Sequence, residues 1–154
     1  MAEWIFKRIA EEEGKKEEFE ISSAAVSYEE IGNDIYPPAK RVLKERGIPF
    51  EKHRAHRITL DEILAADYVL VMDTSNQRLM SNLISREASN YQEIEAAEAK
   101  VHLLMEWYSK EHKLHPIPEV ADPWYTDNFI RAFDDIYNGC REFLRECIHR
   151  DNCE

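Results

Sequence analysis

Glycine is scarce in this sequence, with four residues in 154, and no two stand close enough to form a Gly-rich phosphate loop. No apolar run approaches the roughly 18 residues that a membrane-spanning helix needs. Positive charge is in deficit, because 20 Lys and Arg face 31 Asp and Glu, for a formal net charge of −11. Nucleic acid and anionic membranes attract an excess of Lys and Arg, so this balance argues against both as the main partner.

Cysteine is also scarce, with three residues that all follow position 139. An odd, clustered set fits a reducing cytoplasm better than a disulfide framework, and we expect a cytoplasmic protein. His112 and His115 have no Cys or Asp at ligand spacing nearby, so no metal site is expected. No Cys has an Arg six positions on, the arrangement of a phosphate-cradling Cys loop: that position holds Glu146 after Cys140 and Cys153 after Cys147.

Strand and helix patterns alternate along the chain, which predicts one α/β domain over residues 1–154, a sandwich around a parallel sheet. Unbroken apolar runs predict buried strands at 67–73 and 100–107, and 18–25 predicts another. Helices are expected over 1–13, 36–46, 75–86 and 129–149, and a loop over 109–121. Thr59 and Glu62 form a capping-box pattern, whereas the first helix has no capping residue ahead of it.

Functional side chains of such folds lie at the carboxyl ends of the strands. The sequence therefore predicts functional residues in 22–30, in 73–76 and in the loop that carries Asp122. Asp122 precedes Pro123, which restricts it to an extended conformation, and Trp124 and Tyr125 follow. This is either a held carboxylate beside an aromatic slot or an ordinary Asp-Pro turn. His53 lies in the basic segment EKHRAHR, which is either an anion site or a surface turn.

Six segments in a fixed order carry a resemblance to a known family: MAEWIF, ISSAAVSYEEIGN, HRAHRIT, DYVLVMDTSN, KVHLLM and DPWY. Together they resemble the low molecular weight protein-tyrosine phosphatases from Met1 to about Glu146. The resemblance implies a three-layer α/β/α sandwich around a four-stranded parallel sheet with the first strand in its middle. It also implies a cofactor-free reaction, in which aryl phosphate monoesters are hydrolysed through a cysteinyl-phosphate intermediate.

The resemblance assigns roles to individual residues. It makes Asp122 the general acid and base, and Trp124 and Tyr125 the aromatic pair that flanks the substrate, although many members have Tyr where Trp124 stands. The variable wall of the substrate slot would be formed by Tyr28, Glu29 and Glu30. Ser23 and His53 would hydrogen-bond the Asn of the phosphate loop and hold its backbone. The substrate would be a phosphotyrosine protein or a small aryl phosphate.

One part of the family pattern is missing from the 154 residues. The family carries a Cys-x5-Arg-Ser-Pro loop, preceded by the first strand, directly before the segment that MAEWIF matches. We therefore expect an N-terminally shortened phosphatase that is inactive as the 154-residue chain. The alternatives are a catalytically dead phosphoprotein-binding module, an arsenate reductase or a protein-arginine phosphatase on the same fold, and an unrelated flavodoxin-like binding protein. Arsenate reduction is disfavoured because no Cys occurs between Met1 and Gly139.

Overall fold

The computed structural model describes residues 1–29 and 31–151, in which two short strands lie among a larger number of helices. In chain order the elements are α1 (Ala2–Glu12), the 3-10 helix η1 (Lys16–Glu18), α2 (Pro37–Glu45), α3 (Leu60–Ala65), β1 (Val69–Val71), α4 (Thr74–Glu87), α5 (Tyr91–Glu98), β2 (Val101–Leu103), α6 (Glu106–His112), α7 (Pro123–Thr126) and α8 (Phe129–Asp151). Across this described part, no helix is both long enough and apolar enough to cross a membrane.

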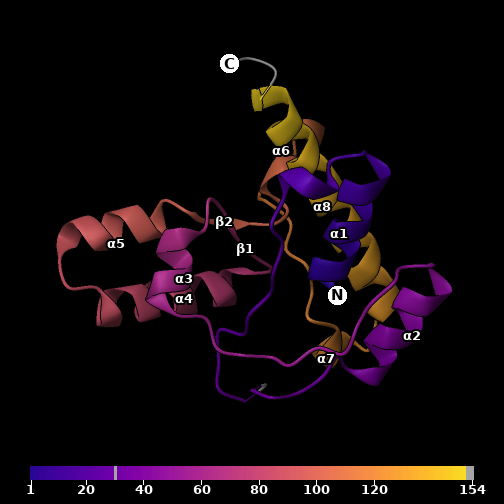
Figure 1. Ribbon diagram of the computed structural model, residues 1–154, viewed down its shortest axis with the longest axis horizontal. Coiled ribbons are helices and arrows are strands. Elements are labelled where there is room, and N and C mark those ends of the chain that lie inside the picture. Colours follow the sequence, from indigo (N-terminus) through magenta and orange to yellow (C-terminus); the bar gives the residue numbers. More distant parts are fainter. Residues whose placement is uncertain (30, 152–154) are drawn as a thin grey trace.

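The strands β1 and β2 form a parallel pair in the middle of the molecule, with Val69 opposite Val101 and Val71 opposite Leu103. Because side chains alternate along a strand, each face of the pair packs on a different core. Val71 and Leu103 pack against α3, α4 and α5, whereas Leu70 packs toward α1 and α8. Figure 1 shows these two groups of helices on opposite sides of the strands. The predicted α/β class is therefore confirmed.

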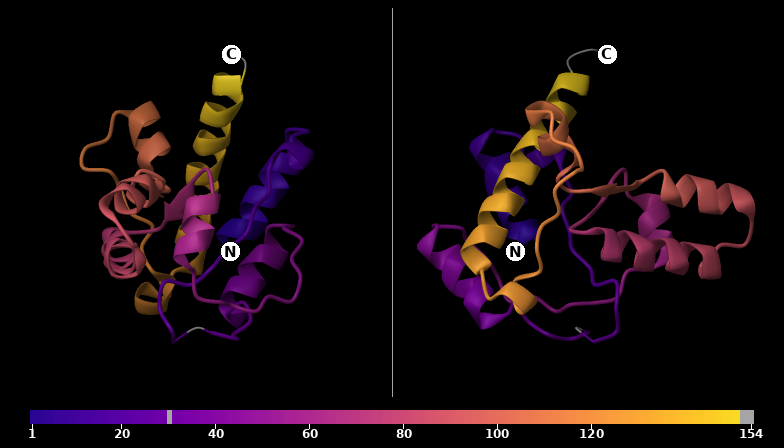
Figure 2. Two further views of the ribbon diagram at one scale, coloured as in Figure 1. Left: turned by 60° about the vertical axis from the view of Figure 1, so that its left-hand side comes forward. Right: turned by 180° about the vertical axis from the view of Figure 1, so that it is seen from behind.

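The larger core is built around α8, whose stripe of Phe133, Ile136, Cys140, Phe143 and Leu144 is buried as its helical spacing predicts. The helix α1 packs along it, and α2 and α6 also contact it (Figure 2). The start of α8 and the short α7 lie at one end of the molecule (Figures 1 and 2). That end carries the candidate site.

The strand expected over 18–25 does not form. Glu18 ends the 3-10 helix η1, and the extended chain that follows makes a single parallel bridge, Ala25 with Arg57. In that bridge Ala25 donates to the His56 carbonyl at 2.7 Å and accepts from Ile58 at 2.9 Å. A strand needs a continuous hydrogen-bonded neighbour, and none accompanies 19–24 within the described residues.

One edge of β1 has no strand beside it in the described part of the chain. Val69 donates to Lys100, and Leu104 donates to the Val71 carbonyl, both at 2.8 Å. Since backbone groups of a parallel strand point alternately to its two edges, the N–H and C=O of Leu70 face away from β2. The sheet is thus a two-stranded pair among the described residues, rather than the four strands that the resemblance implied.

Several helix boundaries follow local signals and others do not. The capping box of Thr59 and Glu62 is confirmed, Gly14 follows α1 at a φ of +69°, and α1 begins without a side-chain cap. Both strands are shorter than their apolar runs. The strand expected over 100–107 ends at Leu103, and α6 begins at Glu106. The loop expected from 109 therefore begins only at Lys113. The helix α5, capped by Asn90, was not predicted.

Candidate active site

The carboxyl end of β1 is where the Asp122 loop is attached. Asp73 caps α4 by accepting from the N–H of Asn76 at 2.7 Å, and the Asn76 side chain in turn accepts from the N–H of Met72 at 3.2 Å. The Met72 carbonyl accepts from Val120 at 3.0 Å. This last bond anchors the chain two residues before Asp122 at the edge where parallel α/β proteins carry their sites.

Asp122 is exposed and caps the four-residue helix α7. Its Oδ1 atom accepts from the N–H of Trp124 at 2.9 Å, and Pro123 occupies the first helical position. The sequence left open an Asp-Pro turn, and the local structure is this capped turn of helix. One carboxylate oxygen is held by the cap, and the second has no hydrogen bond within the described residues.

Aromatic side chains lie beside this carboxylate. Trp124 is 66% exposed and its ring lies 5.1 Å from that of Tyr36, which precedes α2. Tyr36 also contacts Phe129 at the start of α8, with ring centroids 5.7 Å apart. Tyr125 projects outward and is 86% exposed. Tyr36 was not among the predicted site residues. The two prolines directly after it indicated the start of α2, but no pattern in the sequence indicated that its ring contacts Trp124.

Tyr28 is held by Arg57 and not by the other predicted wall residues. Arg57 donates to the Tyr28 hydroxyl at 2.7 Å, and its guanidinium carbon lies 4.3 Å from the ring centroid. No ring contact joins Tyr28 to Trp124 among the described residues. Glu29 is exposed next to Tyr28, and Glu30 lies outside the described residues.

Ser23 and His53 converge on Glu3, a residue that the sequence analysis did not single out. Ser23 Oγ donates to Glu3 Oε2 at 2.5 Å, and His53 Nδ1 lies 3.8 Å from the same oxygen. Lys7 pairs with the other oxygen at 2.5 Å. Burial alone would raise the pKa of Glu3, but the hydrogen bonds from Lys7 and Ser23, with the charges of Lys7 and His53, hold it below its ordinary value.

Part of the positive charge of the basic segment around His53 is paired with carboxylates of this chain. His56 Nε2 lies 2.7 Å from Glu62, and Arg57 lies 3.7 Å from Glu87. These pairs favour the surface-turn interpretation of EKHRAHR over an anion site.

In the described chain, no group of three His, Cys, Asp or Glu side chains lies at metal-binding distances.

The sequence of the whole chain is similar to that of known proteins. The family model for "Low molecular weight phosphotyrosine protein phosphatase" matches residues 1–153. The human protein of that name is 28% identical over 148 residues, which cover 95% of this chain and 85% of the human one. The Bacillus subtilis low molecular weight protein-tyrosine-phosphatase YfkJ is 25% identical over 144 residues, covering 94% and 84%.

Solved structures agree on the fold. The crystal structure of Bacillus subtilis YfkJ superposes with a TM-score of 0.81 at 22% identity, covering 97% of this chain and 86% of that one. Vibrio vulnificus Wzb in complex with benzylphosphonate superposes with a TM-score of 0.73 at 17% identity, covering 94% and 87%. Since the family model matches residues 1–153 and the solved structures share the fold, this chain belongs to the low molecular weight phosphotyrosine protein phosphatase family.

Proposed function

We propose that this chain supplies the proton donor and substrate walls of a cytoplasmic phosphotyrosine phosphatase, acting as one domain on phosphotyrosine proteins or small aryl phosphates. The observation that carries the proposal is the exposed Asp122 carboxylate at the cap of α7, tied to the carboxyl end of β1 and beside the Trp124 ring. The relative bound to benzylphosphonate, in which a CH2 group joins a phenyl ring to phosphorus, supports a substrate whose aryl ring is one atom away from phosphorus. The buried free thiol of Cys140 fits a reducing compartment.

In this proposal Asp122 acts in both steps of the reaction. A Cys thiolate attacks phosphorus, and the bond from phosphorus to the phenol oxygen breaks. Asp122 donates its proton to the departing phenolate, whose conjugate acid has a pKa of about 10. The Asp122 carboxylate then takes a proton from water as that water attacks the cysteinyl phosphate and releases the thiolate. Such proton transfer typically contributes about 10²–10⁴-fold to the rate.

The remaining predicted residues would shape the slot. Trp124 and Tyr125 would flank the aromatic ring of the substrate, with Tyr28, Glu29 and Glu30 on its variable wall. Ser23 and His53 would hydrogen-bond the Asn of the phosphate loop and hold its backbone, and in this chain both lie against Glu3 at the start of α1. No Cys among the 154 residues has an Arg six positions on, so the nucleophile and the phosphate cradle are not in this segment.

The first test is the activity of chain 1–154 by itself. We expect no hydrolysis of p-nitrophenyl phosphate above the buffer rate. Turnover that survives substitution of Cys140, Cys147 and Cys153 together would reveal another nucleophile and overturn the proposal. Binding of a phosphotyrosine peptide without turnover would favour the alternative, a catalytically dead binding module.

The second test assigns the proton donor. A first strand and Cys-x5-Arg loop are joined ahead of Met1, and Asp122→Asn is compared with Asp127→Asn, a matched change at the other end of α7. Asn caps helices as well as Asp, so the first change removes the proton and keeps the cap. We expect kcat to fall about 10²–10⁴-fold for Asp122→Asn, more for poorer leaving groups, with little change in KM. An equal loss across the leaving-group series would remove Asp122 from this role.

A further inference from the structure

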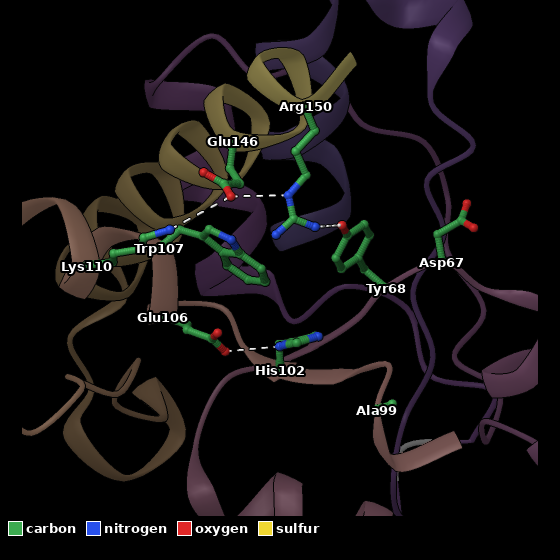
Figure 3. Close-up of a pocket in the computed structure, with 9 residues that line it drawn as sticks. All are labelled: Asp67, Tyr68, Ala99, His102, Glu106, Trp107, Lys110, Glu146 and Arg150. Carbon is green, nitrogen blue, oxygen red and sulfur yellow. Dashed lines mark hydrogen bonds and ion pairs between the residues drawn. The ribbon is translucent and has the colours of Figure 1, made fainter. Parts of the chain in front are cut away.

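A cavity lies at the opposite end of the strands from Asp122. It has a volume of about 400 Å³ and opens between α6 and the carboxyl-terminal part of α8 (Figure 3). Asp67 and Tyr68 line it just before β1, whereas the Asp122 loop is anchored at Met72, just after that strand. The volume is within the range of small-molecule sites, about 300–1,000 Å³. The cavity is therefore separate from the proposed catalytic site.

Three aromatic rings form the walls of this cavity. The ring centroids of Tyr68, His102 and Trp107 lie 5.3 to 6.2 Å apart. Trp107 is only 8% exposed, and its indole N–H has no hydrogen bond among the described residues. Among the described residues, the side-chain nitrogen or oxygen that is both buried and without a hydrogen bond is Arg57 Nε. The indole N–H of Trp107 is therefore part of the small exposed surface of this residue. This accessible donor beside the aromatic rings can donate a hydrogen bond to an acceptor of a ligand with a flat ring.

Positive charge is in surplus on one side of the cavity. Figure 3 shows Lys110, Trp107 and Arg150 gathered around Glu146. Arg150 Nε lies 3.2 Å from a Glu146 oxygen, and Lys110 Nζ lies 3.9 Å from the same oxygen. Arg150 also donates to the Tyr68 hydroxyl at 2.8 Å. Lys110 is therefore the cation of this side that has no partner within hydrogen-bond distance in the described chain. This side is suited to a carboxylate from a ligand.

The other side of the cavity carries acceptors. Glu106 Oε2 lies 3.1 Å from His102 Nδ1, and its second oxygen has no hydrogen bond among the described residues. The carboxylate of Asp67 stands at the rim (Figure 3). We propose that this cavity binds a small aromatic zwitterion of the α-amino-acid type. Its ring would lie against the aromatic walls, its carboxylate by Lys110 and the Trp107 N–H, and its ammonium by Glu106.

The test is a titration of chain 1–154 with L-phenylalanine, 3-phenylpropionate and 2-phenylethylamine, followed by the indole N–H signals in NMR spectra. The sequence has three Trp, and substitution of Trp4 and Trp124 by Phe leaves the signal of Trp107 alone. We expect phenylalanine to shift this signal at millimolar concentration and to bind at least about tenfold more tightly than either single-charge analogue. The absence of a shift, or equal binding of an analogue, would refute the proposal.

Exposed charged residues allow a variant series that leaves the core intact. Lys110→Met should weaken binding of phenylalanine and phenylpropionate about fivefold, and Glu106→Gln should weaken phenylalanine and phenylethylamine similarly. Lys44→Met, on the exposed face of α2, is the charge-matched control and should change neither. Unchanged affinity in Lys110→Met would overturn the assignment. If a variant misfolds by circular dichroism, the analogue series on the unaltered chain decides.

Discussion

Substitution of Glu3 by Gln tests the contacts that hold α1 to the extended segment carrying Ser23. The Glu3 side chain is 10% exposed and accepts hydrogen bonds from Ser23 and Lys7, both at 2.5 Å. A bond to a charged, largely buried partner contributes about 1.5–3 kcal/mol. The pair with Lys7, which is 40% exposed, contributes about 0.2–1 kcal/mol. Gln retains one acceptor oxygen, so we expect Glu3→Gln to lower the free energy of unfolding by about 2 kcal/mol.

The assay is urea unfolding at neutral pH, followed by circular dichroism. The matched control is Glu12→Gln on the exposed part of α1, where the pair with Arg8 at 2.7 Å contributes about 0.3–0.5 kcal/mol. A double-mutant cycle of Glu3→Gln with Ser23→Ala isolates the buried bond. A loss for Glu3→Gln no larger than that of the control would show that this contact does not stabilise the fold.

The same substitution has a pH dependence with a definite sign. The pKa of Glu3 is lowered in the folded chain, so the ionised carboxylate stabilises the fold above its unfolded value near 4.5. This contribution is lost as the pH falls from about 4.5 through the folded pKa. The difference between the original chain and Glu3→Gln should therefore shrink over that acid range. A difference that is constant from neutral pH to well below 4.5 would contradict the proposed ionic contact.

Three further predictions concern packing, the sheet edge and a buried thiol. Gly139→Ala should lower the free energy of unfolding by about 1–2 kcal/mol in urea, because the new Cβ would lie 2.8 Å from Leu104 Cγ. This clash exceeds the gain in helix propensity from Gly to Ala, which is about 1 kcal/mol. A stabilised variant would contradict this. In hydrogen exchange, the Leu70 amide at the open edge should exchange at least about tenfold faster than that of Val71; equal protection would show that the edge is covered. Burial raises the pKa of the Cys140 thiol to about 12, so a disulfide reagent at pH 8 should leave Cys140 unmodified until the chain unfolds.

Local sequence signals determined most of the helices. The stripe on α8, the prolines at the start of α2, the capping box of Thr59 and the glycine after α1 each act within a few residues, and the structure follows them. The aspartate before Pro123 was also evident from sequence, and its capping of α7 depends only on neighbouring residues. Such features are predictable because the interacting groups are close in the chain.

Tertiary structure decided what depends on distant partners. The apolar run at 67–73 yields only three strand residues, and 18–25 yields none, because strand length is set by a neighbouring strand rather than by composition. The Glu3 contacts to Ser23 and His53, and the Tyr36 ring against Trp124, join segments 20 to 88 residues apart in the sequence. The cavity beside α6 likewise combines the residues just before β1 with residues of β2, α6 and α8. No pattern within one segment encodes these long-range contacts, because they form only when the two cores pack on opposite faces of β1 and β2.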